Sequence, residues 1–250
     1  MGFLGMCGTQ EFACVLRAEW RLKETIGPPF LHAKFPRDFF LPRGNIQPMM
    51  ETPRILVFAG SLRAGSFNKK LARIAAEAVR DAGAEVTLID LLDFPMPILN
   101  QDDEDASGLP ENARKVKALF RSHHGVLIAS PEYNSSISGV LKNTIDWISR
   151  EESEEEPGLV AFSGKTFALV SASPGALGGM RGLVHLRSIL GAIGGFVLPG
   201  QVSISKAGDA FDAAEEDAPP RLKDARKQAQ IEELAKALVE VTRRLEPPTR

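Results

Sequence analysis

Five strand-like runs, separated from one another by segments with helical periodicity, constrain the fold of this chain more than any other feature. The clearest run, residues 55–59, is continuously apolar, as expected for a parallel strand that is covered on both faces. The five runs are residues 55–59, 85–90, 125–130, 165–171 and 195–198. Because helices alternate with these strands, the pattern predicts an α/β fold: a doubly wound, five-stranded parallel sheet with right-handed crossovers.

The segments between the strands indicate where the helices and loops lie. Apolar residues recur at helical spacing in residues 67–79, 110–120, 138–149, 183–193 and 231–245. The proline-rich segment 93–105 and the acidic run 151–156, EESEEE, are predicted to be loops, and the acidic run is expected to be solvated. The polar segment 209–220 is predicted to be a surface loop.

Composition places the chain among ordinary globular proteins. Its 250 residues are 44% hydrophobic and 25% charged, with a formal net charge of −2. This balance gives no reason to expect nucleic acid or a membrane as a partner, and no apolar run approaches the ~20 residues of a membrane span. The two cysteines, Cys7 and Cys14, lack the spacing of a zinc site or a disulfide framework. We therefore expect a cytoplasmic protein.

Residues 1–49 differ from the rest of the chain. They contain both cysteines and six of the fourteen phenylalanines, and prolines interrupt them repeatedly. We interpret them as an N-terminal extension, and residues 50–250 as the folded domain. One explanation is that translation begins at Met49 or Met50, which we favour; the other is an arm that packs on a neighbouring subunit.

The loop after the first strand, residues 60–68 (GSLRAGSFN), has the composition of a phosphate site. Main-chain N–H groups at a helix start attract anions, and hydroxyl, amide and guanidinium groups add donors. A triphosphate-binding P-loop is excluded because Ser66 and Phe67 stand where Lys and Ser/Thr are required. The Gly-x-Gly-x-x-Gly of a dinucleotide loop is also missing. A monophosphate such as that of FMN fits better; the alternative is an ordinary strand–turn–helix with Ser66 as its N-cap.

Two further loops follow strands and should reach the same edge of the sheet, where ligands bind in such folds. Residues 131–136 (PEYNSS) include Tyr133, the only tyrosine, whose ring can stack on a flat ligand. Residues 171–179 (SASPGALGG) are rich in glycine, which lets main-chain N–H groups approach a planar edge. Turn geometry alone would account for either loop by itself; three such loops together favour a ligand site.

Other chemistries find little support in the sequence. None of the four histidines belongs to an H-E-x-x-H motif, so a metal site is not predicted. There is no Gly-x-Ser-x-Gly elbow, which argues against a serine hydrolase. The adjacent His123 and His124 are interpreted as surface residues.

Together, GSLRAGSFN at 60–68, PEYNSSISGVLKNTIDW at 131–147 and SASPGALGG at 171–179 resemble the NADPH-dependent FMN reductase family, which includes quinone, azo-dye and chromate reductases. The resemblance extends from about residue 54 to about residue 198 and does not cover residues 1–49. It implies a flavodoxin-like sheet with strand order 2-1-3-4-5 and helices on both faces.

The resemblance also implies which residues bind FMN. The phosphate would be held by Ser61, Arg63, Ser66 and Asn68. The ribityl chain and isoalloxazine would be lined by Pro131, Glu132, Tyr133 and Asn134. Ser171, Ser173 and Gly175 would lie at the ring edge. We name no acid–base catalytic residue, because FMN carries the chemistry in this family.

The implied activity is that of an NAD(P)H-dependent FMN reductase or quinone reductase: two electrons pass from NADPH (or NADH) through FMN to a small-molecule acceptor, in a ping-pong order. The resemblance further implies a homodimer or homotetramer, because the helix carrying Lys142, Asn143, Asp146 and Trp147 is commonly buried between subunits in the family. The alternative is that Trp147 packs in its own core. Alternative functions are a flavodoxin-type electron carrier and a non-catalytic flavin-binding module.

Overall fold

The five strands in the described part of this protein form one parallel sheet in the order β2-β1-β3-β4-β5. A computed structural model describes residues 52–212 and 220–245, so the predicted extension, residues 1–49, lies outside the described residues. The strands are β1 (Arg54–Ala59), β2 (Glu85–Asp90), β3 (Gly125–Ala129), β4 (Thr166–Ala172) and β5 (Phe196–Ile204). The predicted fold class and the flavodoxin-like strand order are confirmed.

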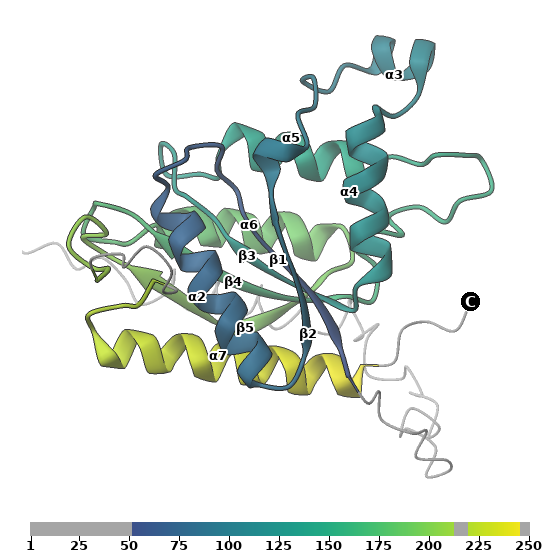
Figure 1. Cartoon of the computed structure of the whole chain (residues 1–250). Coiled ribbons are helices and arrows are strands. Elements are labelled where there is room, and N and C mark those ends of the chain that lie inside the picture. Colours follow the sequence, from purple (N-terminus) through teal and green to yellow (C-terminus); the bar gives the residue numbers. More distant parts are fainter. Residues whose placement is uncertain (1–51, 213–219, 246–250) are drawn as a thin grey trace, which may run out of the picture. The chain divides into compact units, whose positions relative to one another are not determined.

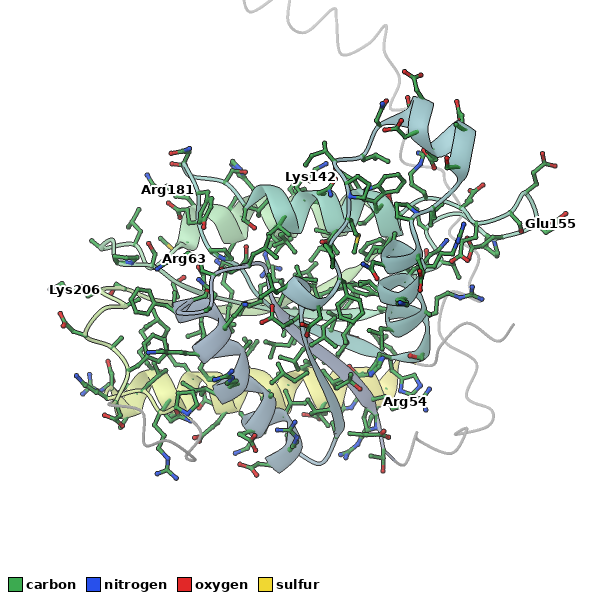
Figure 2. The ribbon with its side chains drawn as sticks, turned by 45° about the horizontal axis from the view of Figure 1, so that its top comes forward. Arg54, Arg63, Lys142, Glu155, Arg181 and Lys206 are labelled. Atoms are coloured by element: carbon green, nitrogen blue, oxygen red, sulfur yellow. The ribbon has the colours of Figure 1, made fainter. Side chains whose placement is uncertain are left out.

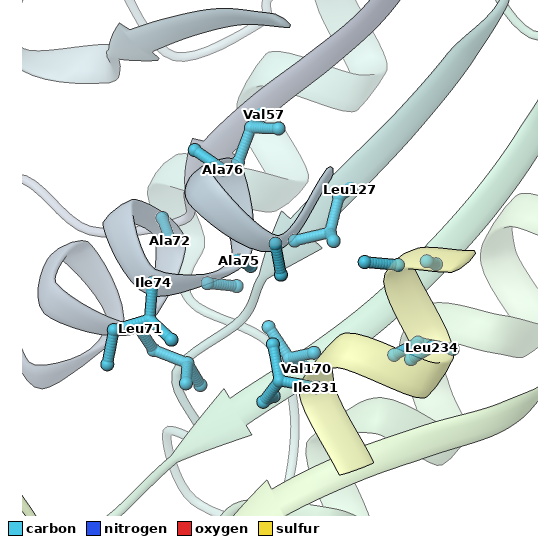
Figure 3. Close-up of a cluster of buried hydrophobic side chains, with 14 of the residues drawn as sticks. Val57, Leu71, Ala72, Ile74, Ala75, Ala76, Leu127, Val170, Ile231 and Leu234 are labelled. Carbon is cyan, nitrogen blue, oxygen red and sulfur yellow. The ribbon is translucent and has the colours of Figure 1, made fainter. Parts of the chain in front are cut away.

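Helices cover both faces of the sheet (Figure 1). One face is packed by α2 (Phe67–Asp81) and α7 (Ala225–Arg244), and the other by α4 (Glu111–Ser122), α5 (Gly139–Ile148) and α6 (Met180–Ala192). Successive strand residues point to opposite faces, and β1 shows the consequence. Val57 belongs to the core beneath α2 and α7 (Figure 3), whereas Phe58 belongs to the core beneath the other three helices. This double burial explains why the strand is apolar throughout.

Two elements differ in extent from the prediction. Residues 195–198, where the sequence pattern begins the fifth strand, are followed by Pro199 and Gly200, and β5 continues through both to Ile204. It is an edge strand with a register shift against β4, and such positions tolerate proline because one side of the strand needs no partner. The segment predicted as a loop contains a short helix, α3 (Gln101–Ser107), which projects from the body in Figure 1. Asn100 caps α3 by accepting from the Asp102 N–H, and acidic residues fill its first turn.

The prediction that both adjacent histidines lie on the surface is wrong for His123, which is 6% exposed. It lies near the amino ends of the strands, where Nδ1 is 2.6 Å from the Leu119 carbonyl oxygen and Nε2 is 2.7 Å from the Thr87 hydroxyl. A carbonyl only accepts, so Nδ1 carries the proton and Nε2 accepts from Thr87. Both ring nitrogens of a neutral imidazole are thereby satisfied, which allows burial.

Residues 151–155 of the acidic run are exposed, as expected for a solvated loop, but Glu156 departs from that expectation. The Glu156 side chain is 8% exposed and pairs with the buried Lys117 of α4 and, at 3.2 Å, with Arg121. Burial raises the pKa of the Glu156 carboxyl, but hydrogen bonds from Lys117 and the Glu152 N–H, together with the nearby cations, outweigh it, and the pKa lies below its ordinary value. This carboxylate therefore fastens the run to α4.

The segment after β5 returns to the start of α2. Residues 213–219 of the predicted surface loop lie outside the described residues, and on either side of them Phe211 and Leu222 form an antiparallel bridge. The Phe211 ring stacks on Phe67, the first residue of α2, at 6.0 Å between centroids. Within residues 52–212 and 220–245, no helix is both long enough and apolar enough to cross a membrane.

Candidate functional site

The loop between β1 and α2 presents unused donors at the carboxyl edge of the sheet. Residues 62–65 are exposed, and the N–H groups of Ala64 and Gly65 donate to no acceptor within the described residues. The Arg63 side chain forms no ion pair with any described residue. Ser66 caps α2 by accepting from the Lys69 N–H at 3.4 Å. A helix start with free N–H groups and an unpaired guanidinium is a suitable site for a phosphate.

Two buried side chains hold this loop in place. Ser138, the N-cap of α5, donates from its hydroxyl to the Gly60 carbonyl oxygen at 2.6 Å. Asn68, in the first turn of α2, hydrogen-bonds both main-chain groups of Ala172 at the end of β4, each at 2.9 Å. The main chain at Gly60 packs closely against the Leu141 side chain, since a Cβ on residue 60 would lie 2.9 Å from it. The phosphate-type loop is thus built against the helix that follows the loop after β3 and against the end of β4, where the third loop begins.

The loop after β3 forms a tight turn. The main chains of Tyr133 and Ser136 exchange two hydrogen bonds, of 2.9 and 3.0 Å. Between them Asn134 and Ser135 have φ values of 49° and 66°, as in a type I′ turn, which asparagine tolerates well. The Tyr133 side chain is 52% exposed, so its ring offers a face to a flat ligand.

Glu132, beside this turn, is directed toward α6 rather than into solvent, and its side chain is 8% exposed. Its Oε2 accepts from the N–H groups of Arg181 and Gly182, at 3.0 and 3.2 Å. Its Oε1 accepts from the Arg181 guanidinium at 2.9 and 2.5 Å. Burial raises the pKa of Glu132, but these hydrogen bonds outweigh it and hold the pKa below its ordinary value. The carboxylate is therefore ionised at neutral pH.

The loop after β4 depends on two glycines. Gly178 and Gly179 have φ values of 62° and 89°, and a Cβ on Gly179 would lie 1.9 Å from the Ser171 Oγ. Ser171 is fully buried, and its Oγ has no hydrogen-bond partner within the described residues. Residues 174–177, by contrast, are exposed. The loop therefore presents its outer part, including Gly175, to a ligand and uses Gly179 for close packing.

The structure brings the sequence-predicted residues to one edge of the sheet but divides them into two groups by exposure. Arg63, Tyr133, Asn134 and Gly175 are exposed, and Ser173 is partly so. Ser61, Ser66, Asn68, Pro131 and Ser171 are buried, and Glu132 is largely buried. The first group is placed to contact a ligand, through side chains at Arg63, Tyr133 and Asn134 and through main chain at Gly175. The second group is placed to position main chain.

Three residues at this edge were not predicted from the sequence. Leu177 and Met180 are 45% and 44% exposed and lie in or next to the glycine-rich loop. Lys206 follows β5, has a φ of 49°, and donates its N–H to the Gly175 carbonyl oxygen. Figure 2 shows Lys206 on the same side of the view as Arg63 and Arg181, away from Arg54. The spacing of these three residues along the sequence does not identify them as site residues. Only their location after the ends of strands could have done so.

Helix α5 carries the segment that the resemblance associates with subunit contacts. Trp147 is 1% exposed, and its Nε1–H donates to the Pro97 carbonyl oxygen at 2.8 Å. Asn143 donates to the same oxygen and accepts from the Leu99 N–H. The alternative that Trp147 packs within its own subunit is confirmed. Lys142 and Asp146 form an ion pair on the outer side of the helix.

Together, the edge combines an anion-binding loop, an exposed aromatic ring and a glycine-rich loop with apolar neighbours. These features fit a ligand that has one phosphate and a flat ring, as FMN does. Among the residues that the structure describes, no group of three or more His, Cys, Asp or Glu side chains is arranged to hold a metal ion.

Comparison with known proteins supports the same ligand. The family model described as NADPH-dependent FMN reductase matches residues 53–209. The NAD(P)H-dependent FMN reductase of Pseudomonas aeruginosa is 38% identical over 166 residues, which are 66% of this chain and 84% of that protein. The quinone reductase of Escherichia coli K12 is 35% identical over 142 residues, 57% of this chain and 71% of that protein.

A solved structure bears on the fold. The flavoenzyme NAD(P)H:(acceptor) oxidoreductase from Paracoccus denitrificans superposes with a TM-score of 0.62 at 23% identity, over 78% of this chain and 99% of that one. At this identity the likeness supports the shared architecture alone.

Proposed function

This chain belongs to the NADPH-dependent FMN reductase family, a family of oxidoreductases, and from that premise we propose that it passes two electrons from NADPH or NADH through bound FMN to a quinone or a similar small acceptor. The observation that carries the proposal is the pairing, at one sheet edge, of a phosphate-type loop with an exposed tyrosine. FMN, when bound, supplies the two-electron hydride chemistry.

In this proposal, the residues of this chain bind the FMN cofactor and orient it. Arg63 and the free N–H groups of Ala64 and Gly65 hold the phosphate. The exposed Tyr133 would stack on the ring, and the exposed main chain of residues 174–177 would approach its edge. Asn68 and Ser138 act indirectly, because their side chains hold the loops rather than face a ligand.

In this proposal, NAD(P)H and the quinone use the same exposed site at the flavin ring. The two substrates therefore exclude each other, and this sets the kinetic order. The oxidised dinucleotide would have to leave before a quinone could bind at the same site, and we expect a ping-pong pattern with parallel double-reciprocal lines. Intersecting lines would indicate a ternary complex and contradict this part of the proposal. We also propose a cytoplasmic homodimer or homotetramer, as the family resemblance implies.

A direct test is the flavin content of the purified protein. The protein should be yellow and should release FMN on denaturation, because the site offers one phosphate loop. It should also oxidise NADPH when a quinone is supplied. A colourless protein that FMN does not reconstitute, or release of FAD, would overturn the cofactor assignment. Binding of FMN without oxidation of NADPH would indicate an electron carrier or a binding module instead.

A further inference from the structure

Helix α6 begins without a side-chain cap of its own. Its N-cap residue is Gly179, which has a φ of 89° and no side chain to accept from the first N–H groups of the helix. Uncapped N–H groups at a helix start carry a free-energy cost when no partner replaces water. Replacement of Gly179 by a capping residue is blocked, because Ser171 occupies the position of its Cβ.

Glu132 supplies the missing cap from another loop. Its Oε2 accepts from the Arg181 and Gly182 N–H groups, which are the second and third of α6, as a serine or aspartate N-cap would. Its Oε1 binds the Arg181 guanidinium. A carboxylate at a helix start is also favoured by the helix dipole. One side chain thus joins the loop after β3 to the end of the loop after β4.

The Ser171–Gly179 contact shows that this junction is tightly packed. A Cβ on Gly179 would also lie 3.6 Å from the Glu132 Cβ, and a Cβ on Gly182 would lie 3.4 Å from it. The Glu132 side chain therefore lies directly against the first turn of α6. It offers little surface to a ligand, being 8% exposed.

We propose that Glu132 is a positioning residue, which does not contact FMN but caps α6 and thereby fixes residues 174–179 of the glycine-rich loop at the ring edge of the flavin site. This inference rests on the proposed function. Loss of the cap should make the glycine-rich loop more mobile and leave the phosphate-type loop, residues 60–68, unchanged. FMN and riboflavin should therefore lose affinity by the same factor.

The experiment compares four proteins: wild type, Glu132→Ala, Glu132→Gln and Arg181→Gln. Apoprotein is titrated with FMN and, separately, with riboflavin, and the change in flavin fluorescence gives each dissociation constant. Glu132→Ala should raise both constants about 3- to 30-fold, the range expected for loss of a helix cap. Glu132→Gln keeps an acceptor oxygen and should recover part of the loss. Arg181→Gln keeps the two main-chain bonds and should have a smaller effect than Glu132→Ala.

Amide hydrogen exchange provides a readout that needs no flavin. The N–H groups of Arg181 and Gly182 should exchange faster in both Glu132 variants than in wild type, while the start of α2 should be unchanged. Glu156→Gln is the matched control, because Glu156 is another paired carboxylate with a side chain 8% exposed. It should lower stability without changing either flavin constant.

Several results would overturn the inference. Unchanged flavin constants in Glu132→Gln and Glu132→Ala would do so, as would a loss confined to FMN, which would place Glu132 at the phosphate. An equal loss in Arg181→Gln would assign the effect to the ion pair instead of the cap. If Glu132→Ala does not fold, the FMN and riboflavin dissociation constants of Glu132→Gln test the inference in its place. Failure of wild type to bind any flavin would overturn the proposed function, whereas the exchange result would still report on the cap.

Discussion

Both hydrogen-bonding groups of the Asn68 side chain are used by the main chain of Ala172: Nδ2 donates to the carbonyl oxygen and Oδ1 accepts from the N–H, each at 2.9 Å. Asn68 is 3% exposed, so neither bond is shared with bulk solvent. The pair joins the first turn of α2, beside the phosphate-type loop, to the end of β4, where the glycine-rich loop begins.

Asn68→Ala should therefore destabilise the fold. The substitution leaves two buried main-chain groups without partners, which costs about 2–4 kcal/mol in the free energy of unfolding. Urea denaturation measures this loss. Asn112→Ala is the control, since its amide makes one bond to the Pro95 carbonyl oxygen, and it should cost about 1 kcal/mol or less. Equal losses in the two variants would contradict a special role for Asn68.

Arg63→Ala should weaken FMN binding without affecting riboflavin. A charge-assisted hydrogen bond is worth about 1.5–3 kcal/mol, so the FMN dissociation constant should rise roughly 10- to 150-fold. Riboflavin lacks the phosphate and serves as the internal control. Arg73→Ala, an exposed arginine further along α2, should leave both constants unchanged. An unchanged FMN dissociation constant would show that Arg63 does not bind the phosphate.

Stability should fall in mild acid because His124 is held neutral. Burial and the nearby charges of Arg54 and Lys165 lower the pKa of His124 to about 4, and its Nδ1 accepts from the Arg54 N–H at 3.0 Å. Between pH 6.5 and about 4 the unfolded chain binds a proton that the folded chain does not, so stability decreases as the pH falls. Because solvent screens this partly exposed ring, the loss should be about 1–2 kcal/mol.

Urea unfolding at pH 7.5 and pH 5 measures this change. In His124→Asn, which keeps an acceptor for Arg54 but does not titrate, the pH dependence should be reduced. Some dependence should remain, because burial also lowers the pKa of His123. If the two proteins lose the same stability on acidification, the titrating group lies elsewhere.

Removal of residues 1–48 should leave the reductase domain functional. The first strand in the described part of the chain begins at Arg54 and the family match begins at residue 53, so we expect the sheet to form without residues 1–48. The shortened chain should remain soluble and retain FMN and NADPH oxidation. Size-exclusion chromatography and the flavin absorbance spectrum check this. Loss of soluble protein would show that the extension is structural.

Tyr133→Ala should alter the choice of acceptor more than the reduction of the flavin. The Tyr133 ring is exposed at the proposed flavin site, and we expect it to contact the acceptor and to supply no proton or electron to the reaction. The ratio of kcat/KM between quinones of different size should change, while anaerobic bleaching by NADPH should keep its rate. Tyr133→Phe, which retains the ring, should behave as wild type. A slowed bleaching rate in Tyr133→Ala would give the tyrosine a role in hydride transfer.

The sequence by itself determined the sheet and the location of the ligand edge. Buried strands are apolar throughout, and apolar residues on a helix face recur about every 3.6 residues. Both patterns are local, so they can be recognised in the sequence alone. The Gly60, Tyr133 and Gly175 loops could be assigned to one edge because each follows a strand. The sequence also offered Ser66 as an N-cap, and Ser66 does cap α2.

Only the tertiary structure decided what the individual polar side chains do. Asn68 and Glu132 belong to motifs associated with FMN, yet they bind main chain that lies 104 and 49–50 residues away. His123 looked like a surface residue beside His124, but Thr87 and Leu119 satisfy its ring and allow burial. A polar group is buried only where its partners are, and those partners come from distant segments that spacing along the chain does not specify.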